Sequence, residues 1–277
     1  KEETANDENF SKALAQLADI YINDAFGAAH RAHASTAGMT HFFAHKVAGF
    51  LMERELKFLG EKTTHPLRPF VVILGGAKVS DKISVIDALL DRADCMIIGG
   101  AMAYTFLLAQ GHQVGRSLVE PDKTNIALDA IRKAREKNIE FLLPIDAVVT
   151  DHINFETHTL GTTTVVGLDI PENLSGIDIG PQTINLFTKA IQRAKTILLN
   201  GPVGVFEVQE AAQGTFAIID AIAKNRDATS IVGGGESIKA VKKSGRGNDI
   251  TFISTGGGAS LEFLEGKVLP GIAVLDS

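Results

Sequence analysis

Two lysines follow a pair of glycines at a point where a strand pattern changes to a helix pattern. Residues 70–83, FVVILGGAKVSDKI, begin with an apolar run, break at the glycines, and continue past Lys78 and Lys82 as an amphipathic segment. This order predicts a buried strand, a glycine turn and a helix capped at residues 80–81. Glycines bring backbone N–H groups close to a ligand, and a helix N-terminus favours anions. The predicted ligand is a phosphate.

The same order of strand, glycine turn and helix recurs in four further segments, at residues 95–106, 197–206, 230–241 and 251–264. In an open α/β sheet, ligands bind outside the carboxyl ends of the strands, where such turns must lie. The five turns therefore predict one pocket.

The segment GGGES contains three glycines, Glu236 and Ser237 between a strand and a helix. Such a turn makes a backbone nest for phosphate, and a carboxylate suits Mg²⁺, a hard cation that prefers oxygen ligands. A tight turn with an exposed capping glutamate explains this segment alone equally well. Residues 256–260, GGGAS, have the same form, and two such turns in one sheet favour the phosphate interpretation.

The segment NGPVGVFE, at residues 200–207, is a rigid turn in which Pro202 fixes the backbone. Glu207 is placed to accept a hydrogen bond from a ribose hydroxyl, although ordinary turn chemistry also accounts for the segment. Nearer the N-terminus, the loop NDAFGAAHRAHAST carries Arg31, which either clamps a phosphate or carboxylate or lies in a solvated loop.

Composition narrows the class of protein. The 277 residues suffice for one large or two ordinary domains, and a net charge of −6 with a pI near 5.8 argues against bulk binding of nucleic acid or anionic membranes. The single cysteine, Cys95, allows no internal disulfide and suggests a reducing cytosol. No apolar run approaches the roughly eighteen residues of a membrane span, so we expect a cytoplasmic protein.

Residues 70–264 alternate short apolar strands with helical patterns. The pattern predicts an α/β fold, a doubly wound parallel sheet with helices on both faces. Residues 150–174, richer in Thr, Asn and Asp, are expected to form loop and edge strand.

The N-terminal residues predict a helix at 10–18, a strand at 19–25 and a long helix at 41–60 that Gly60 ends, followed by a connector at 62–69. A lone strand in this region has no sheet to join. It is therefore either an added edge or the remnant of a missing domain.

The common sequence motifs for nucleotide binding and metal binding are absent from the sequence. It has no G-x-x-x-x-G-K-[ST] loop, G-x-G-x-x-G fingerprint, H-E-x-x-H or Cys/His cluster, so a dehydrogenase or P-loop kinase is disfavoured. The histidines are scattered, and none is assigned to a metal.

Taken together, NDAFGAAHRAHAS, GGAKVSDKI, NGPVGVFE, VGGGES and STGGGASLEFLEGKVLPG closely resemble the phosphoglycerate kinase family, in the family's order and across nearly the whole chain. The resemblance implies phosphoryl transfer between 1,3-bisphosphoglycerate with MgADP and 3-phosphoglycerate with MgATP. It also implies a triose-binding N-terminal domain, a nucleotide-binding C-terminal domain and a monomeric full-length protein. Phosphoryl transfer requires positioning and charge stabilisation more than covalent chemistry.

The resemblance also implies roles for individual residues. Arg31 would bind the triose phosphate. The catalytic set would be Lys78, Gly235 and Gly258. Nucleotide would be bound by Lys78, Lys82, Gly99, Gly100, Asn200, Pro202, Glu207, Gly234, Gly235, Glu236 and Ser237. Glu236 would be the metal ligand for Mg²⁺.

Three departures from the family pattern stand out. The family usually has Asp where Glu236 stands, and Ala101 replaces a common third glycine beside the adenine. The family's N-terminal strands, with their substrate ligands, are missing. The resemblance then divides the chain into a remnant of the triose domain at 1–44, an interdomain helix and connector at 45–69, a nucleotide domain at 70–266 and a tail at 267–277.

We therefore expect a chain that binds nucleotide but has little or no kinase turnover. The alternative is a non-catalytic nucleotide-binding or scaffold protein of the same fold. A different α/β nucleotide enzyme is disfavoured by the joint presence of Lys78, Glu207 and both triple-glycine turns.

Overall fold

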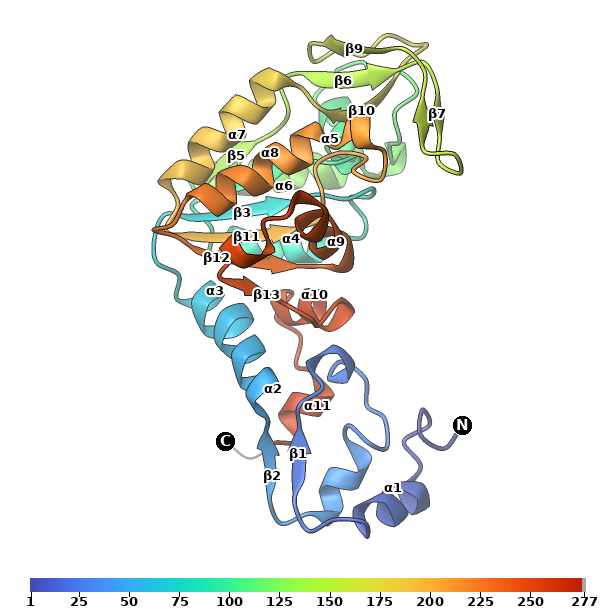
Figure 1. Ribbon diagram of the computed structural model, residues 1–277, viewed down its shortest axis with the longest axis vertical. Coiled ribbons are helices and arrows are strands. Elements are labelled where there is room, and N and C mark those ends of the chain that lie inside the picture. The colour runs from blue at the N-terminus through green and yellow to red at the C-terminus, as the bar shows by residue number, and fades with distance from the viewer. Residues whose placement is uncertain (276–277) are drawn as a thin grey trace. The chain divides into compact units, whose positions relative to one another are not determined.

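A computed structural model describes residues 1–275 of the chain, in two compact units (Figure 1). One unit comprises residues 1–65 together with the chain from residue 254 onward, and the other comprises residues 66–253. The last two residues of the tail expected at 267–277 lie outside the described residues.

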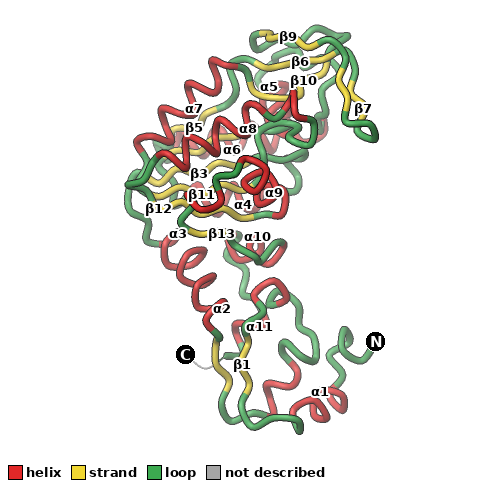
Figure 2. The backbone as a smooth tube through the Cα atoms, viewed as in Figure 1, coloured by secondary structure: helices red, strands yellow, loops and turns green. Residues whose placement is uncertain are grey.

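A six-stranded parallel sheet forms the centre of residues 66–253, in the order β13-β12-β11-β3-β4-β5 (Figures 1 and 2). The strands are β3 (Phe70–Leu74), β4 (Cys95–Ile98), β5 (Glu140–Leu142), β11 (Thr196–Asn200), β12 (Thr229–Gly233) and β13 (Phe252–Ile253). Every residue of β3 and β11 is buried, which explains why these strands read as continuous apolar runs. The predicted α/β fold is confirmed.

Adjacent residues of a strand point to opposite faces of the sheet. Because all residues of β3 and β11 are buried, both faces of the sheet must be covered. Val71 and Ile73 share a hydrophobic core with Phe187, Ile191 and Ile219, so α7 (Pro181–Arg193) and α8 (Gln213–Lys224) cover one face. Helices α4 (Ile83–Leu90) and α5 (Met102–Ala109) both pack against α6 (Thr124–Glu136) in a second group. Helix α9 spans Gly235–Ser244, and short 3₁₀ turns lie at Pro121–Lys123, Gln209–Ala211 and Gly247–Asp249.

The predicted cap of α4 is wrong. The helix begins at Ile83, with no side-chain hydrogen bond to its first turn. Ser80 instead donates both its hydroxyl and its backbone N–H to the Glu120 carboxylate, at 2.6 and 3.0 Å. A serine in a turn has this second use for its hydroxyl, and the glutamate partner is 40 residues away in sequence.

A second sheet includes an edge strand within residues 150–174, as expected. Three antiparallel strands, β6 (Ala147–Thr150), β9 (Thr163–Val166) and β10 (Ser175–Ile179), pair in the order β10-β6-β9. A hairpin of β7 (Ile153–Asn154) and β8 (Thr159–Leu160) lies between them in sequence. β9 is the expected edge strand, and most of it is exposed, which fits a sequence signal of alternating residues and no continuous apolar run.

The smaller unit contains α1 (Glu8–Ala15), β1 (Tyr21–Asn23), β2 (Lys46–Ala48), α10 (Gly258–Leu264) and α11 (Pro270–Ala273), with 3₁₀ turns at Phe26–Ala28 and Gly38–Phe42. A continuous helical segment in this unit is made of α2 (Phe50–Glu55), a π-helical stretch (Leu56–Glu61) and α3 (Lys62–Thr64).

The long helix predicted at 41–60 is therefore wrong at both ends. Residues 46–48 form β2, which pairs in parallel with β1, so the predicted lone strand has a partner. The helix starts only after Gly49, where the Asp24 carboxylate accepts the N–H groups of Leu51 and Met52, at 2.7 and 3.1 Å. It continues through Gly60, where a Cβ atom would lie in ordinary contact with the Phe263 ring, at 3.4 Å.

Candidate functional site

The turns after β3, β4 and β11 lie directly against one another. A Cβ atom on Gly75 would lie 2.0 Å from the Pro202 carbonyl oxygen, and one on Gly201 would lie 2.1 Å from the Gly75 oxygen. A Cβ atom on Gly100, whose φ is +68°, would lie 2.5 Å from the Gly76 oxygen. Glycine is required here because the backbones meet, whereas the sequence interpretation invoked room for a ligand.

The turn after β12 is different because Gly235 faces open space, while Gly233 and Gly234 lie beside the Asn200 side chain. Gly234 has a φ of +86°, and a Cβ atom on Gly235 would meet nothing within 4 Å. No side chain caps the first turn of α9, which begins at Gly235. The first N–H groups of this ten-residue helix therefore remain available to an anion.

Asn200 ends β11 beside this turn and is 1% exposed. Its Oδ1 accepts a hydrogen bond from the Lys82 ammonium. Its Nδ2 is buried without a hydrogen-bond partner among the described residues, and lies 3.3 Å from the position of a Cβ atom on Gly233. A buried donor without a partner is costly, so a ligand acceptor at this point would stabilise the site.

The other predicted phosphate-binding residues occupy the same end of the sheet. Lys78 is exposed in the turn after β3. Beside it, the pKa of Glu120 lies below its usual value, because hydrogen bonds from Ser80 and the charge of Lys78 outweigh the opposing effect of burial. The buried Ser237 hydroxyl accepts the Gly201 N–H at 2.6 Å, so it holds two turns together.

An apolar pocket of about 260 Å³ adjoins these turns. Its walls comprise Tyr104, Leu118, Phe155, Ile177, Val203 and Val205, and Glu207 and Glu236 also line it. A flat aromatic group fits walls of this kind, and carboxylates beside it can accept hydroxyl hydrogen bonds. Glu236 also forms an ion pair with Lys239 at 2.7 Å.

The structure brings most of the predicted nucleotide-binding residues to this region. Gly100, Pro202, Glu207 and Glu236 line the pocket. Gly99 does not line it, since a Cβ atom there would lie 2.5 Å from the Val203 side chain.

Sequence reasoning missed the pocket walls that come from the second sheet and from the β7–β8 hairpin. Phe155 follows β7, and Gly176 and Ile177 belong to β10. The alternation near residues 162–166 weakly predicted the strand β9. No pattern in the sequence predicted that Phe155 lines a pocket.

Two buried groups near this pocket have perturbed protonation. Burial raises the pKa of Asp178 to about 7, despite hydrogen bonds from two backbone N–H groups that lower it. Burial, and then the charge of Asp178, raise the pKa of Tyr104. Tyr104 therefore remains a neutral phenol at physiological pH.

The smaller unit holds the remaining predicted residues. Arg31 is exposed, in a loop where Thr36 donates to its carbonyl at 2.6 Å. Gly258 begins α10, and His30 lies beside it, with its Nε2 3.8 Å from the position of a Cβ atom on Gly258. The loop of Arg31 and the second triple-glycine turn thus lie close together.

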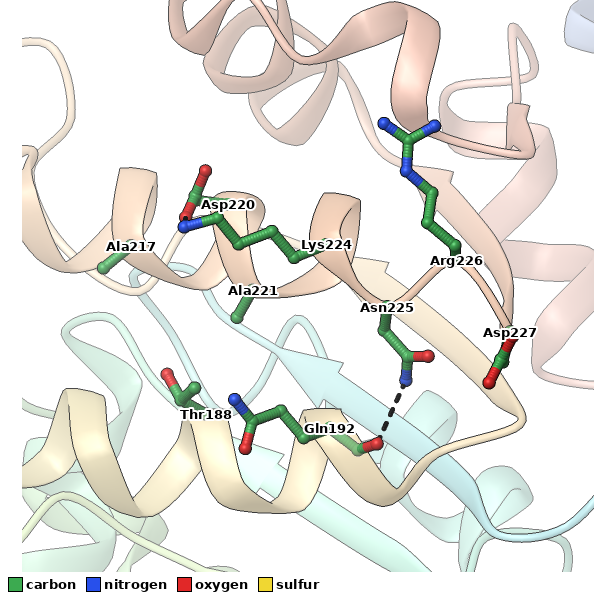
Figure 3. Close-up of a pocket in the computed structure, with 9 residues that line it drawn as sticks. All are labelled: Thr188, Gln192, Ala217, Asp220, Ala221, Lys224, Asn225, Arg226 and Asp227. Atoms are coloured by element: carbon green, nitrogen blue, oxygen red, sulfur yellow. Dashed lines mark hydrogen bonds and ion pairs between the residues drawn. The ribbon is translucent and has the colours of Figure 1, made fainter.

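A larger hollow, of about 530 Å³, lies between α7 and α8 (Figure 3). Its charged groups are already paired: Asp220 with Lys224 and Arg246, and Arg226 with Asp249. Asn225 donates to carbonyl groups at the end of α7. These groups are satisfied by the protein itself, so the hollow offers little to a ligand.

Within residues 1–275, no cluster of three or more His, Cys, Asp or Glu side chains is arranged to hold a metal ion. None of the helices described over the same residues is long and apolar enough to cross a membrane.

Comparisons with known proteins cover the whole chain. The family described as phosphoglycerate kinase matches residues 1–267. A phosphoglycerate kinase of Clostridioides difficile is 53% identical over 277 residues, which are 100% of this chain and 68% of that protein, and one of Clostridium novyi is 55% identical over 99% of this chain and 68% of that protein. The solved structure of phosphoglycerate kinase from Coxiella burnetii matches with a TM-score of 0.93 and 42% identity, over 99% of this chain and 69% of that one. The chain belongs to the phosphoglycerate kinase family, a family of phosphotransferases.

Proposed function

We propose that residues 66–253 bind ADP or ATP at the carboxyl ends of β3, β11 and β12. The observation that carries this proposal is the buried Asn200 Nδ2 without a partner, beside the uncapped start of α9. These donors suit the phosphates of a nucleotide, and Lys82 adds a cation. The adjoining apolar pocket takes the base, with Glu207 accepting from the ribose.

In this proposal, Lys78 stabilises charge on the phosphoryl group that is transferred, while Gly234 and Gly235 offer backbone donors. Positioned donors and cations of this kind are what phosphoryl transfer requires of a protein. Asn200 orients the Lys82 ammonium through the hydrogen bond that its Oδ1 accepts.

Mg²⁺ is the proposed cofactor, and Glu236 is the carboxylate available to it. Mg²⁺ is commonly held by one or two carboxylates together with substrate phosphates, so the absence of a three-residue cluster among the described residues fits such a site. The ion would neutralise charge on the phosphates. Glu236 must first exchange its partner Lys239, which is 67% exposed.

The family relationship extends the proposal to a complete reaction, reversible transfer between 1,3-bisphosphoglycerate and ADP in the cytoplasm. Arg31 would bind the triose phosphate, and Gly258 would supply a backbone donor to the transferred group. We propose that this chain binds nucleotide but turns over poorly, because it spans about two thirds of its relatives' length. The full-length protein would be a monomer and would bind neither nucleic acid nor membranes.

Two measurements test the proposal. Calorimetry with MgADP is expected to give saturable one-to-one binding, and no detectable binding would contradict the nucleotide site. A coupled assay with 3-phosphoglycerate and MgATP is expected to give little turnover, and appreciable turnover would contradict the proposal that this chain turns over poorly. Nucleotide binding without turnover, even after the sequence is extended to its relatives' length, would favour the alternative of a non-catalytic scaffold.

A further inference from the structure

A buried aspartate lies behind the apolar pocket, and the proposed reaction gives it no role. Asp178 belongs to β10 and is 2% exposed. Its Oδ2 accepts the N–H of Gly214 at 2.6 Å, and its Oδ1 accepts the N–H of Ile179 at 2.9 Å. The carboxylate thus joins the second sheet to the first turn of α8.

An irregularity in β10 sets the direction of this side chain. The pairing register with β6 shifts between Gly176 and Asp178. Such a bulge adds a residue on one strand and re-aims the side chains around it. Gly176 and Ile177 line the pocket, while the next residue carries its carboxylate into the interior.

The opposite wall of the pocket is fixed to the same elements. A Cβ atom on Gly204 would lie 2.1 Å from the Asp178 Oδ1, so the carboxylate packs against this stretch of backbone. Val205 donates its N–H to the Ile177 carbonyl at 2.8 Å, and Val203 donates to the Thr215 hydroxyl of α8 at 3.2 Å. Three consecutive wall residues therefore depend on β10 and on the start of α8.

We propose that Asp178 is a positioning residue for this pocket: its ionised carboxylate holds β10, α8 and residues 203–205 in register, and so sets the affinity for the base of a nucleotide. The inference rests on the proposed function, since it assigns the pocket to the base. Asp178 acts through the walls and does not line the pocket itself.

The charge state of Asp178 should make binding to the pocket depend on pH. Its pKa of about 7 is set by burial and, in the opposite direction, by the two backbone N–H groups. The titratable groups on the helices packed around it include Tyr104 of α5, whose pKa the charge of Asp178 raises, and Asp220 and Lys224 of α8, which form an ion pair with each other at 2.6 Å. Protonation weakens the hydrogen bonds that the carboxylate accepts from Gly214 and Ile179, so the walls loosen as the pH falls below 7, although removal of the buried charge stabilises the fold as a whole.

Adenosine is the appropriate probe because it has no phosphate, and its base does not titrate between pH 6 and 8. For the wild-type chain, the affinity for adenosine is expected to fall about tenfold from pH 8 to pH 6, as one group with a pKa near 7 takes up a proton. Asp178→Asn is expected to bind adenosine about tenfold more weakly at pH 8, with a flat profile.

The matched control is Asp146→Asn, which changes another buried aspartate that accepts two N–H groups at the start of a helix, in this case α7. This control is expected to retain the affinity and the pH profile of the wild type. Wild-type binding of MgADP with a flat adenosine profile overturns the inference alone, and that measurement decides even if Asp178→Asn fails to fold. Absence of both MgADP and adenosine binding refutes the proposed function, and the inference with it.

Discussion

Asn200→Asp is the sharpest test of the phosphate site, because it changes one atom of a buried side chain. The new carboxylate keeps an acceptor for Lys82, and its other oxygen replaces the Nδ2 donor. An unpaired donor thereby becomes a negative charge at the place where the proposal puts a phosphate. The fold gains an ion pair while the ligand loses a partner.

The size of the effect follows from those two changes. Loss of a hydrogen bond to a charged phosphate costs about 1.5–3 kcal/mol. Repulsion between the carboxylate and the phosphate adds on the order of 1 kcal/mol or more at a site that opens to solvent. The affinity for MgADP should therefore fall by roughly a hundredfold or more.

Calorimetry with MgADP and with adenosine separates the two ends of the site. Asn200→Asp should weaken MgADP binding and leave adenosine binding nearly unchanged, since adenosine carries no phosphate. The control is Asn225→Asp, which alters an asparagine that donates to carbonyl groups at the end of α7. MgADP binding by Asn200→Asp within threefold of the wild type would refute the assignment of Nδ2 to a phosphate.

Four further predictions concern stability, reactivity and association. Asp146→Ala should lower the free energy of unfolding by about 2 kcal/mol, measured by urea denaturation, because two N–H groups in the first turn of α7, one of them buried, lose their acceptor; a loss below 0.5 kcal/mol would contradict this. The pKa of Asp178 is raised to about 7, so the folded state binds this proton more tightly than the unfolded state does. The free energy of unfolding should therefore be highest below about pH 4 and fall by a few kcal/mol as the pH rises to 7. Denaturation of Asp178→Asn should lack this fall. Cys95 is 3% exposed, and burial followed by the charge of Glu140 raises its pKa to about 12, so iodoacetamide at pH 8 should modify it only in denaturant; rapid labelling of the native chain would count against it. Ile22 and Phe50 of the smaller unit are 61% and 84% exposed, and light scattering should detect association that grows with concentration; a monomer throughout the range would show that this surface does not self-associate.

The sequence was most informative where burial is complete. β3, β4 and β11 are apolar on both faces, and each ends at a glycine turn, so both their existence and their parallel pairing could be predicted. The polar residues at those ends then follow from topology, because the carboxyl ends of parallel strands lie along one edge of a sheet. Asn200 and Lys82 were placed at the same site by this reasoning, although their hydrogen bond was not foreseen.

Prediction failed where tertiary partners decide local structure. Residues 46–48 have helical spacing with the residues that follow, yet they pair with β1. Asp24, more than twenty residues earlier in sequence, caps the helix that starts after Gly49. Propensity and periodicity contain neither contact, so the start of the helix could not be found from the local pattern.

The glycines show why a motif alone is a weak guide to a ligand site. Gly75 and Gly201 look like phosphate-loop glycines in the sequence, but each is needed because another backbone lies against it. Gly235 looks the same, yet the space beside it is open and the helix start behind it has no side-chain cap. Where a glycine packs against other backbone, that packing accounts for the absence of a side chain. Where a glycine faces open space beside unpaired donors, a bound ligand is needed to account for it. By this criterion the turn after β12, together with Asn200, is the part of the edge that a phosphate completes.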